Sequence, residues 1–380
     1  MGFLNKKIVT PGGIKDCAVG PDGAISVHDH LAGVDAASLV VPGYADLHVH
    51  FRDFEQKRKE TVETGSLAAL AGGACAVADM PNTSPPVADR GSYFLRKKLF
   101  EDTCACDYLI NFCAYDEYSL SQAASVDPFF IKVYLGETTG SYVLDPSLLE
   151  RVFMLGKPIA IHAGYAGMKE ALKLSARYST QLHICHVSTK EEVELIAGAK
   201  TPLVTCEVTP HHLFLEGDYP VKPPLAGERD RKALWNALGN VIDIVASDHA
   251  PHTLEDKAGG AYGVSGIETT VPLMVDAMLK KVISPETLYS CMHGAQASLL
   301  SGRGIRFGLF DGSRSDFAVV GTDSIHAIDP SEFRSKAKHS PFEGMEVAAR
   351  VEETWVRGKK RYFNGTFDTG EMGMEMGTAI

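Results

Sequence analysis

Apolar runs alternate with amphipathic stretches along most of the chain. Continuous apolar runs, rather than strictly alternating ones, are typical of strands that are buried on both faces of a parallel sheet. Eight such runs are present, at 39–49, 73–80, 107–114, 129–135, 158–163, 182–187, 202–208 and 241–247. Helices are predicted between most of them, at 59–71, 90–100, 146–155, 166–178, 189–199 and 228–238.

The spacing of these runs predicts a (β/α)8 barrel. His48 in the first run and Asp248, just after the last, are 200 positions apart (248 minus 48). Seven strand-to-strand steps then average about 29 residues, which is an ordinary length for a strand–helix unit. Eight parallel strands with intervening helices close into a barrel, and chemistry in such barrels lies at the C-terminal ends of the strands.

The two ends of the chain show a different pattern, with short strands separated by Gly- and Asn-containing turns. Neither end is large enough to fold alone. We therefore predict a small β-sandwich domain built from both termini, residues 1–45 and 306–370, beside a barrel of residues 46–305. Residues 371–380 are rich in Gly and Met and are predicted to form an extended or poorly ordered tail.

Composition narrows the classes of function. The formal net charge of −11 argues against binding to nucleic acid or to anionic membranes. No run approaches the roughly 18 apolar residues of a membrane span, and the N-terminus lacks the apolar segment of a signal peptide. Eight cysteines without a CxxC pair are typical of a reduced, cytoplasmic protein.

Polar residues end several of the predicted strands. The residues are His48, His50, His162, His186 and Asp248. Taken singly, such a histidine is more often a hydrogen-bonded structural residue, and such an aspartate is often a helix cap. Together they converge on one rim of the barrel, and two histidines one residue apart on a strand point to the same side and can share a metal ion. This pattern predicts a metal site.

Lys132 lies inside the fourth apolar run. Burial of a charged lysine is costly and favours its neutral amine, which can react with CO2 to form a carbamate. A carbamate is a bidentate anion that can bridge two metals. The alternative is a lysine whose stem is buried and whose head reaches solvent.

Three further features surround the predicted metal site. Arg52 would face the same side as the histidine pair if the strand continued that far, and its guanidinium suits an anionic substrate. Cys185 and Glu207 offer either an additional metal site or a packed thiol and a hydrogen-bond partner. At least one of His211 and His212 is predicted to be structural, because adjacent residues on a strand face opposite ways.

The motifs at these strand ends resemble those of the dihydroorotase family of the amidohydrolase superfamily. The likeness spans roughly residues 40–300 and rests on His48-Val-His-Phe-Arg52, Ala78-Asp-Met-Pro-Asn-Thr83, Ile131-Lys-Val-Tyr-Leu135, Ile161-His-Ala163, His183-Ile-Cys-His-Val187, Glu207-Val-Thr-Pro-His-His-Leu-Phe214 and Ala246-Ser-Asp-His-Ala-Pro-His-Thr253. The resemblance implies a (β/α)8 barrel with two zinc ions. It assigns His48, His50 and Asp248 to one zinc and His162 and His186 to the other, with carboxylated Lys132 and a hydroxide as bridges.

The resemblance also implies an activity, the reversible interconversion of N-carbamoyl-L-aspartate and L-dihydroorotate in pyrimidine biosynthesis. In that reaction the metal-bridged hydroxide attacks the ring amide carbonyl, and Asp248 serves as general acid and base. The residues implied to contact substrate are Arg52, Asn82, Thr138, Lys222, His252 and, through main-chain atoms nearby, Ser265.

Two alternatives stay open from the sequence. Dihydropyrimidinases and allantoinases share the barrel and the metal ligands, although Arg52 together with Asn82 favours a substrate with a carboxylate. A non-catalytic scaffold relative is the other alternative, and the complete set of ligand positions argues against it. Two assemblies also stay open, a homo-oligomer and an association with aspartate transcarbamoylase.

Overall fold

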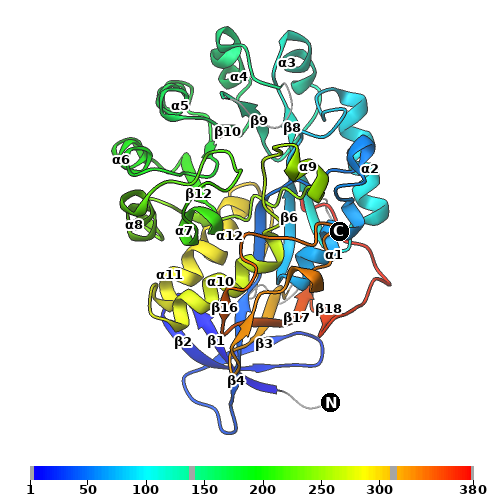
Figure 1. The fold of residues 1–380 in the computed structure, drawn as a ribbon, viewed down its shortest axis with the longest axis vertical. Coiled ribbons are helices and arrows are strands. Elements are labelled where there is room, and N and C mark those ends of the chain that lie inside the picture. Colours follow the sequence, from blue (N-terminus) through cyan, green and yellow to red (C-terminus); the bar gives the residue numbers. More distant parts are fainter. Residues whose placement is uncertain (1–3, 137–141, 309–314, 378–380) are drawn as a thin grey trace.

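Eight parallel strands form a barrel surrounded by helices in the computed structural model (Figure 1), which describes residues 4–136, 142–308 and 315–377. The strands follow one another around the barrel in sequence order and confirm the predicted fold class. They are β5 (Tyr44–Val49), β6 (Ala74–Asp79), β7 (Asp107–Ile110) continued by β8 (Phe112–Cys113), β9 (Ile131–Tyr134), β10 (Ile159–His162), β11 (Leu182–Ile184), β12 (Val204–Val208) and β13 (Ile244–Val245).

The ladder of the barrel is irregular at two places. Asn111 separates β7 from β8, and its N–H donates to Asp79 at 3.2 Å. Between β13 and β5 the ring is closed by a bridge between Val49 and His249, and by a hydrogen bond of 2.8 Å from the N–H of His50 to the carbonyl of His249. The second junction holds the end of the first strand against the segment that follows the last strand.

Helices cover the outside of the barrel. They include α1 (Val62–Ala71), α2 (Arg90–Thr103), α3 (Glu117–Ala123), α4 (Leu149–Met154), α5 (Tyr165–Tyr178), α6 (Lys190–Ala199), α8 (Glu228–Ala237) and α10 (Ile267–Leu279). Capping boxes begin four of these helices, at Thr61, Asp89, Asp116 and Thr189, and satisfy N–H groups of the first turn. The short α3 was not predicted.

Shorter helical segments lie in the loops and after the barrel. They are α7 (Pro210–Phe214), α9 (Leu254–Ala258), α11 (Pro285–Tyr289), α12 (Ala295–Ser301), the 3-10 turns η1 (Phe54–Gln56), η2 (Pro146–Leu148) and η4 (Pro330–Glu332), and the π turn η3 (Ser290–Gly294). None of the helices in the described ranges is long and apolar enough to cross a membrane. All eight cysteines fall in those ranges, where they are buried and form no disulfide.

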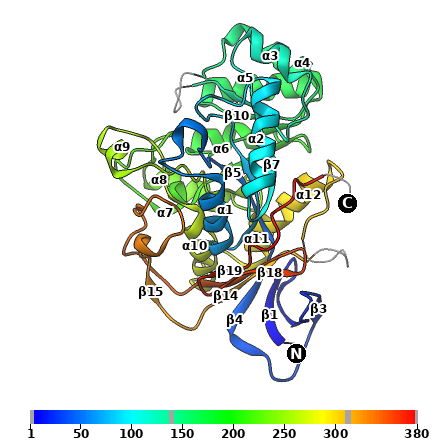
Figure 2. The ribbon, with the colours of Figure 1, turned by 90° about the vertical axis from the view of Figure 1, so that its right-hand side faces the viewer.

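Strands from both ends of the chain combine into one eight-stranded sheet at the end of the molecule away from α3 and α4 (Figures 1 and 2). Its order is β19-β18-β17-β14-β4-β1-β2-β3, and every pair is antiparallel except β1–β4. The strands are β1 (Leu4–Thr10), β2 (Gly13–Val19), β3 (Ile25–His28), β4 (Asp35–Pro42), β14 (Phe317–Gly321), β17 (Arg350–Val356), β18 (Lys359–Phe363) and β19 (Thr366–Phe367). A separate two-stranded ribbon joins β15 (His326–Ala327) to β16 (Glu346–Val347).

Two further features belong to this region. The apolar run 39–49 is divided at Gly43 into β4 of the small sheet and β5 of the barrel. A side chain at Gly43 would lie 2.6 Å from Cβ of Asp316, so the close approach at this junction requires glycine. As far as residue 377 the tail is extended and bonds to β7, since the N–H of Tyr108 donates to the carbonyl of Met374 and the N–H of Met376 donates to the carbonyl of Tyr108. The domain boundaries themselves stay predictions.

Candidate active site

A cleft opens at the C-terminal ends of the barrel strands, where the sequence pattern predicted the chemistry. Two residues with polar side chains in its lining, Tyr134 and Tyr262, were not predicted. Tyr134 was detectable, because it follows Lys132 by two positions on β9 and therefore faces the same side. Nine of the twelve predicted site residues line this cleft: His48, His50, Arg52, Asn82, Lys132, His162, His186, Lys222 and Asp248.

Two histidines and one carboxylate meet on one side of the cleft. Oδ1 of Asp248 lies 3.0 Å from Nε2 of His50 and 3.4 Å from Nε2 of His48. The other ring nitrogen of each histidine faces an acceptor, Glu207 beside His48 and Oδ1 of Asn82 at 2.6 Å from His50. These acceptors favour the tautomer with the proton on Nδ1, which leaves the Nε2 lone pairs toward Asp248.

This arrangement has the chemistry of a metal-binding site. Donor atoms that each lie about 2.0–2.1 Å from one tetrahedral zinc ion are about 3.3 Å apart, close to the observed separations. Burial disfavours a charge on His48, but the carboxylates of Glu207 and Asp248 outweigh that effect and raise the pKa of His48 to about 10. The two buried carboxylates therefore favour a positive charge between them, which a metal cation supplies as well as a proton does.

A second pair of donors lies beside the first. Nδ1 of His162 is 2.8 Å from Nε2 of His186, and the ring of His186 is centred 5.4 Å from the ring of His48. Burial, together with His162, holds the pKa of His186 well below its usual value, so its imidazole is neutral and can bind a metal. Ligand atoms of His48, His186 and Asp248 all lie within 4.8 Å of one another, so the two groups adjoin.

Lys132 lies at the base of the cleft on β9. The residue is 0% exposed, which excludes the alternative in which its head reaches bulk solvent. Its Nζ is 2.8 Å from Sγ of Cys185 and 5.4 Å from the centre of the Tyr134 ring. No carboxylate of the described residues forms an ion pair with this amine. Modification of the amine to an anion would therefore add a ligand without breaking an ion pair.

Three site residues have left-handed backbone conformations. The φ angles are 43° at Arg52, 38° at His186 and 45° at Asp248. Residues other than glycine seldom adopt such angles, and those that do are concentrated at functional sites. The strand geometry of β5 therefore ends before Arg52, and this turn, rather than strand alternation, directs its side chain into the cleft.

The guanidinium of Arg52 is buried and only partly bonded. Its Nη2 lies 3.1 Å from Nε2 of His252, whereas Nε and Nη1 have no hydrogen-bond partner among the residues that the structure describes. Burial lowers the pKa of Arg52 to about 10, so it still carries its charge at neutral pH. Burial and the nearby Arg52 and Lys59 lower the pKa of His252 to about 2, which keeps that ring neutral. A buried cation with two unused N–H groups is suited to an anionic ligand.

The remaining predicted substrate contacts are placed differently from one another. Lys222 lines the cleft with its Nζ 4.4 Å from the centre of the Tyr262 ring. Ser265 does not line it, and its carbonyl accepts from Ser340 at 3.1 Å, although Gly263 of the same segment does line the cleft. Thr138 lies outside the described residues.

The structure defines the surroundings of Glu207 and of the pair His211–His212. One oxygen of Glu207 contacts Nδ1 of His48, and the other lies 2.9 Å from Nε2 of His183, which makes it a hydrogen-bond partner of a candidate ligand. His211 and His212 lie in α7, so the argument from strand alternation was wrong. Both ring nitrogens of His212 are bonded nonetheless, to Thr209 at 2.7 Å and to the carbonyl of Pro223 at 3.2 Å.

Comparisons of the sequence with known proteins agree on one family. Residues 37–112 match the family model described as Dihydro-orotase-like. The dihydroorotase of Pyrococcus abyssi is 37% identical over 354 residues, which cover 87% of this chain and 85% of that protein. The dihydroorotase of Thermococcus kodakarensis is 36% identical and covers 85% of this chain and 83% of its own length. Among solved structures, the L-hydantoinase (dihydropyrimidinase) of Arthrobacter aurescens has a TM-score of 0.85 at 25% identity, covering 98% of this chain and 97% of that chain.

Proposed function

This chain belongs to the dihydroorotase family, and from that premise we propose that its cleft interconverts N-carbamoyl-L-aspartate and L-dihydroorotate with two zinc ions. The observation that carries the proposal is the buried, partly unbonded guanidinium of Arg52 beside a cluster of histidine and carboxylate donors. The donors suit hydrolysis of an amide, and the guanidinium suits the carboxylate that distinguishes dihydroorotate from neutral cyclic amides.

Six residues would hold the metals. His48, His50 and Asp248 are assigned to one zinc, His162 and His186 to the other, and carboxylated Lys132 to both. When bound, two zinc ions lower the pKa of a water molecule, so that hydroxide is available near neutral pH, and polarise the substrate carbonyl. The histidine tautomers set by Glu207 and Asn82 support this assignment, because they direct ring lone pairs into the cleft.

Asp248 is proposed to move the proton. Burial alone would raise the pKa of its carboxyl, but His48 and His50 outweigh burial and hold that pKa well below the usual value. The carboxylate is therefore ionised at neutral pH and can take a proton from the attacking water. It then delivers the proton to the ring nitrogen as the amide bond breaks. In the direction of cyclisation the same group removes the proton from the carbamoyl nitrogen and gives it to the departing hydroxide, which leaves as water.

Arg52 is proposed to bind the substrate carboxylate through its free N–H groups. Replacing Arg52 with Met is expected to lower kcat/KM for dihydroorotate about 100-fold, because a hydrogen bond to a charged group contributes roughly 1.5–3 kcal/mol. Dihydrouracil is the same ring without the carboxylate, so its slower hydrolysis should be unaffected. Steady-state rates on both substrates, with zinc content determined for each variant, check this expectation.

Arg58→Met is the matched control for that experiment. Arg58 lies in the same loop but is exposed, and it pairs with Asp256 rather than lining the cleft. The control should hydrolyse both substrates at the wild-type rate. An equal loss on both substrates in Arg52→Met, or no loss on dihydroorotate, would contradict the assigned role.

The two assemblies considered from the sequence, a homo-oligomer and a complex with aspartate transcarbamoylase, are retained as proposals. Light scattering on the purified chain, alone and mixed with that enzyme, distinguishes them. The mass of a single chain for the protein alone, together with no species heavier than either protein in the mixture, would contradict both.

A further inference from the structure

A segment near the C-terminus reaches over to the loops of the active site. Residues 334–340, here called the strap, lie between η4 and β16 and were predicted to belong to the small terminal domain. They contact the loops that follow β5 and β13, the first and last strands of the barrel. Three strap side chains donate to main-chain carbonyls in or beyond those loops: Lys336 to Lys57 (2.6 Å), His339 to His252 (2.9 Å) and Ser340 to Ser265 (3.1 Å).

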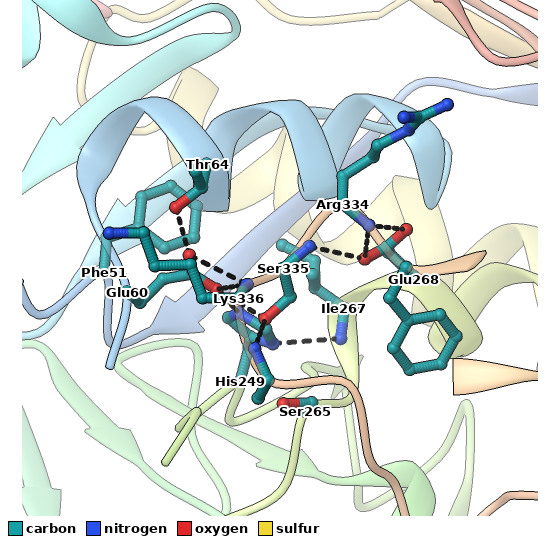
Figure 3. A network of polar contacts seen from close by, with 12 residues as sticks. Phe51, Glu60, Thr64, His249, Ser265, Ile267, Glu268, Arg334, Ser335 and Lys336 are labelled. Atoms are coloured by element: carbon teal, nitrogen blue, oxygen red, sulfur yellow. Dashed lines mark hydrogen bonds and ion pairs between the residues drawn. The ribbon is translucent and has the colours of Figure 1, made fainter. Parts of the chain in front are cut away.

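Two glutamates, the buried Glu60 and the half-buried Glu268, hold the start of the strap from opposite sides (Figure 3). Glu268, in the first turn of α10, accepts the main-chain N–H groups of Arg334 at 2.8 Å and Ser335 at 3.0 Å. Glu60, just before α1, accepts the hydroxyl of Ser335 at 2.5 Å and lies 3.3 Å from the main-chain nitrogen of Lys336. Ser335 is therefore fixed between two carboxylates and is 0% exposed.

Glu60 connects the strap to both catalytic loops. Its main-chain carbonyl accepts from the N–H of Asp53, the residue that follows the proposed carboxylate-binding arginine. Its Oε2 lies 3.6 Å from Nε2 of His249, which is adjacent to Asp248 in the chain. Nδ1 of His249 accepts from the N–H of Ile267 at 3.5 Å, so the ring directs its other nitrogen toward Glu60 (Figure 3).

A buried carboxylate is stable only when donors surround it, and the strap supplies part of that set. Besides Ser335 and Lys336, the donors of Glu60 are Thr61 and Thr64, which belong to its own loop and helix. Loss of the Ser335 hydroxyl would leave the carboxylate short of a donor and would release the strap from the loops. Small displacements of catalytic groups are costly, because a shift of about 1 Å can lower a rate about 100-fold.

We propose that Glu60 and Ser335 are positioning residues, which hold the loops of Arg52 and Asp248 in place by fixing the strap against them. The strap thus makes the C-terminal part of the chain a component of the active site. The inference depends on the proposed function only for the choice of assay, since the contacts that carry it do not involve substrate or metal.

The test compares Glu60→Gln, Ser335→Ala and the double variant in zinc-loaded full-length protein. Each single variant is expected to lower kcat for dihydroorotate about tenfold, with little change in KM or zinc content, because the groups are displaced rather than removed. The double variant should lose no more than the worse single variant, since both changes break one contact. Amide hydrogen exchange in a peptide covering 248–253 should become faster in each.

Glu332→Gln and Ser331→Ala are the matched controls. Both residues are exposed, lie just before the strap and make no contact with the catalytic loops in the described structure. Values of kcat within twofold of wild type in both single variants, or losses that multiply in the double variant, would overturn the proposal. If Glu60→Gln does not fold, Ser335→Ala decides alone, because it removes a single hydroxyl. If the wild type does not act on dihydroorotate, the proposed function fails, and the same variants are measured on the cyclic amide that it does hydrolyse.

Discussion

Replacing Lys132 with Ala is expected to remove most of the bound zinc and to lower kcat/KM for dihydroorotate at least about 1000-fold, because the substitution deletes the ligand proposed to join both metals. Among the described residues that line the cleft, Asp248 is the one carboxylate, and it is already assigned to a single metal. Short carboxylic acids such as acetate should restore part of the zinc and of the activity, since a carboxylate has the same pair of oxygens as a carbamate.

The measurements for this variant are zinc content, steady-state rate and carbon-13 NMR of wild type labelled with CO2. Lys173→Ala is a suitable control, because Lys173 is exposed on α5 and pairs with Glu170. A wild-type spectrum that shows a bare amine at Lys132 in fully active, zinc-loaded protein would contradict the bridged site.

Replacing Asp248 with Asn is the second change with a large expected effect. General acid–base groups contribute about 100- to 10,000-fold, and the amide cannot accept the proton, so kcat should fall about 1000-fold. The amide oxygen remains where the carboxylate was, and a substantial part of the zinc should therefore stay bound. The loss in kcat/KM should be the same for hydrolysis and for cyclisation, because both directions share one transition state.

Asp243→Asn provides the control for this experiment. Asp243 precedes β13, pairs with Lys200 and lies outside the cleft lining. Rates in both directions and zinc content should match those of wild type. Retention of more than a tenth of the wild-type kcat by a zinc-loaded Asp248→Asn variant would show that another group moves the proton.

The pattern of apolar residues predicted much of the fold, but it did not predict the irregularities of the fold. Long apolar runs located all eight barrel strands, because parallel strands bury both faces. The division at Gly43 depends on contact with Asp316, a residue 273 positions away (316 minus 43), so no local sequence pattern predicts it. The break at Asn111 and the short α3 are likewise decided by tertiary contacts and by a brief capping box rather than by a long periodic signal.

The candidate site, like the fold, was predicted in part from the sequence. Residues at strand ends, such as His162 and Asp248, were located by sequence because the barrel brings all strand ends to one rim. Loops follow no such rule. The contact between Glu60 and Ser335 joins residues 275 positions apart, and the contact between Arg52 and His252 joins residues 200 apart. Asn82 was predicted to contact substrate, and the structure places its oxygen against His50, a contact that only the packed site reveals.

The fold by itself does not choose among cyclic amides, because the hydantoinase of Arthrobacter aurescens shares it closely. The central claim is that the cleft selects a ring with a carboxylate, and a comparison of substrates tests it most directly. Zinc-loaded protein should show a kcat/KM for L-dihydroorotate at least about 100-fold above the values for dihydrouracil and allantoin, because a site built to bind a charged group discriminates strongly against substrates that lack it. A higher kcat/KM for dihydrouracil or allantoin would contradict the account.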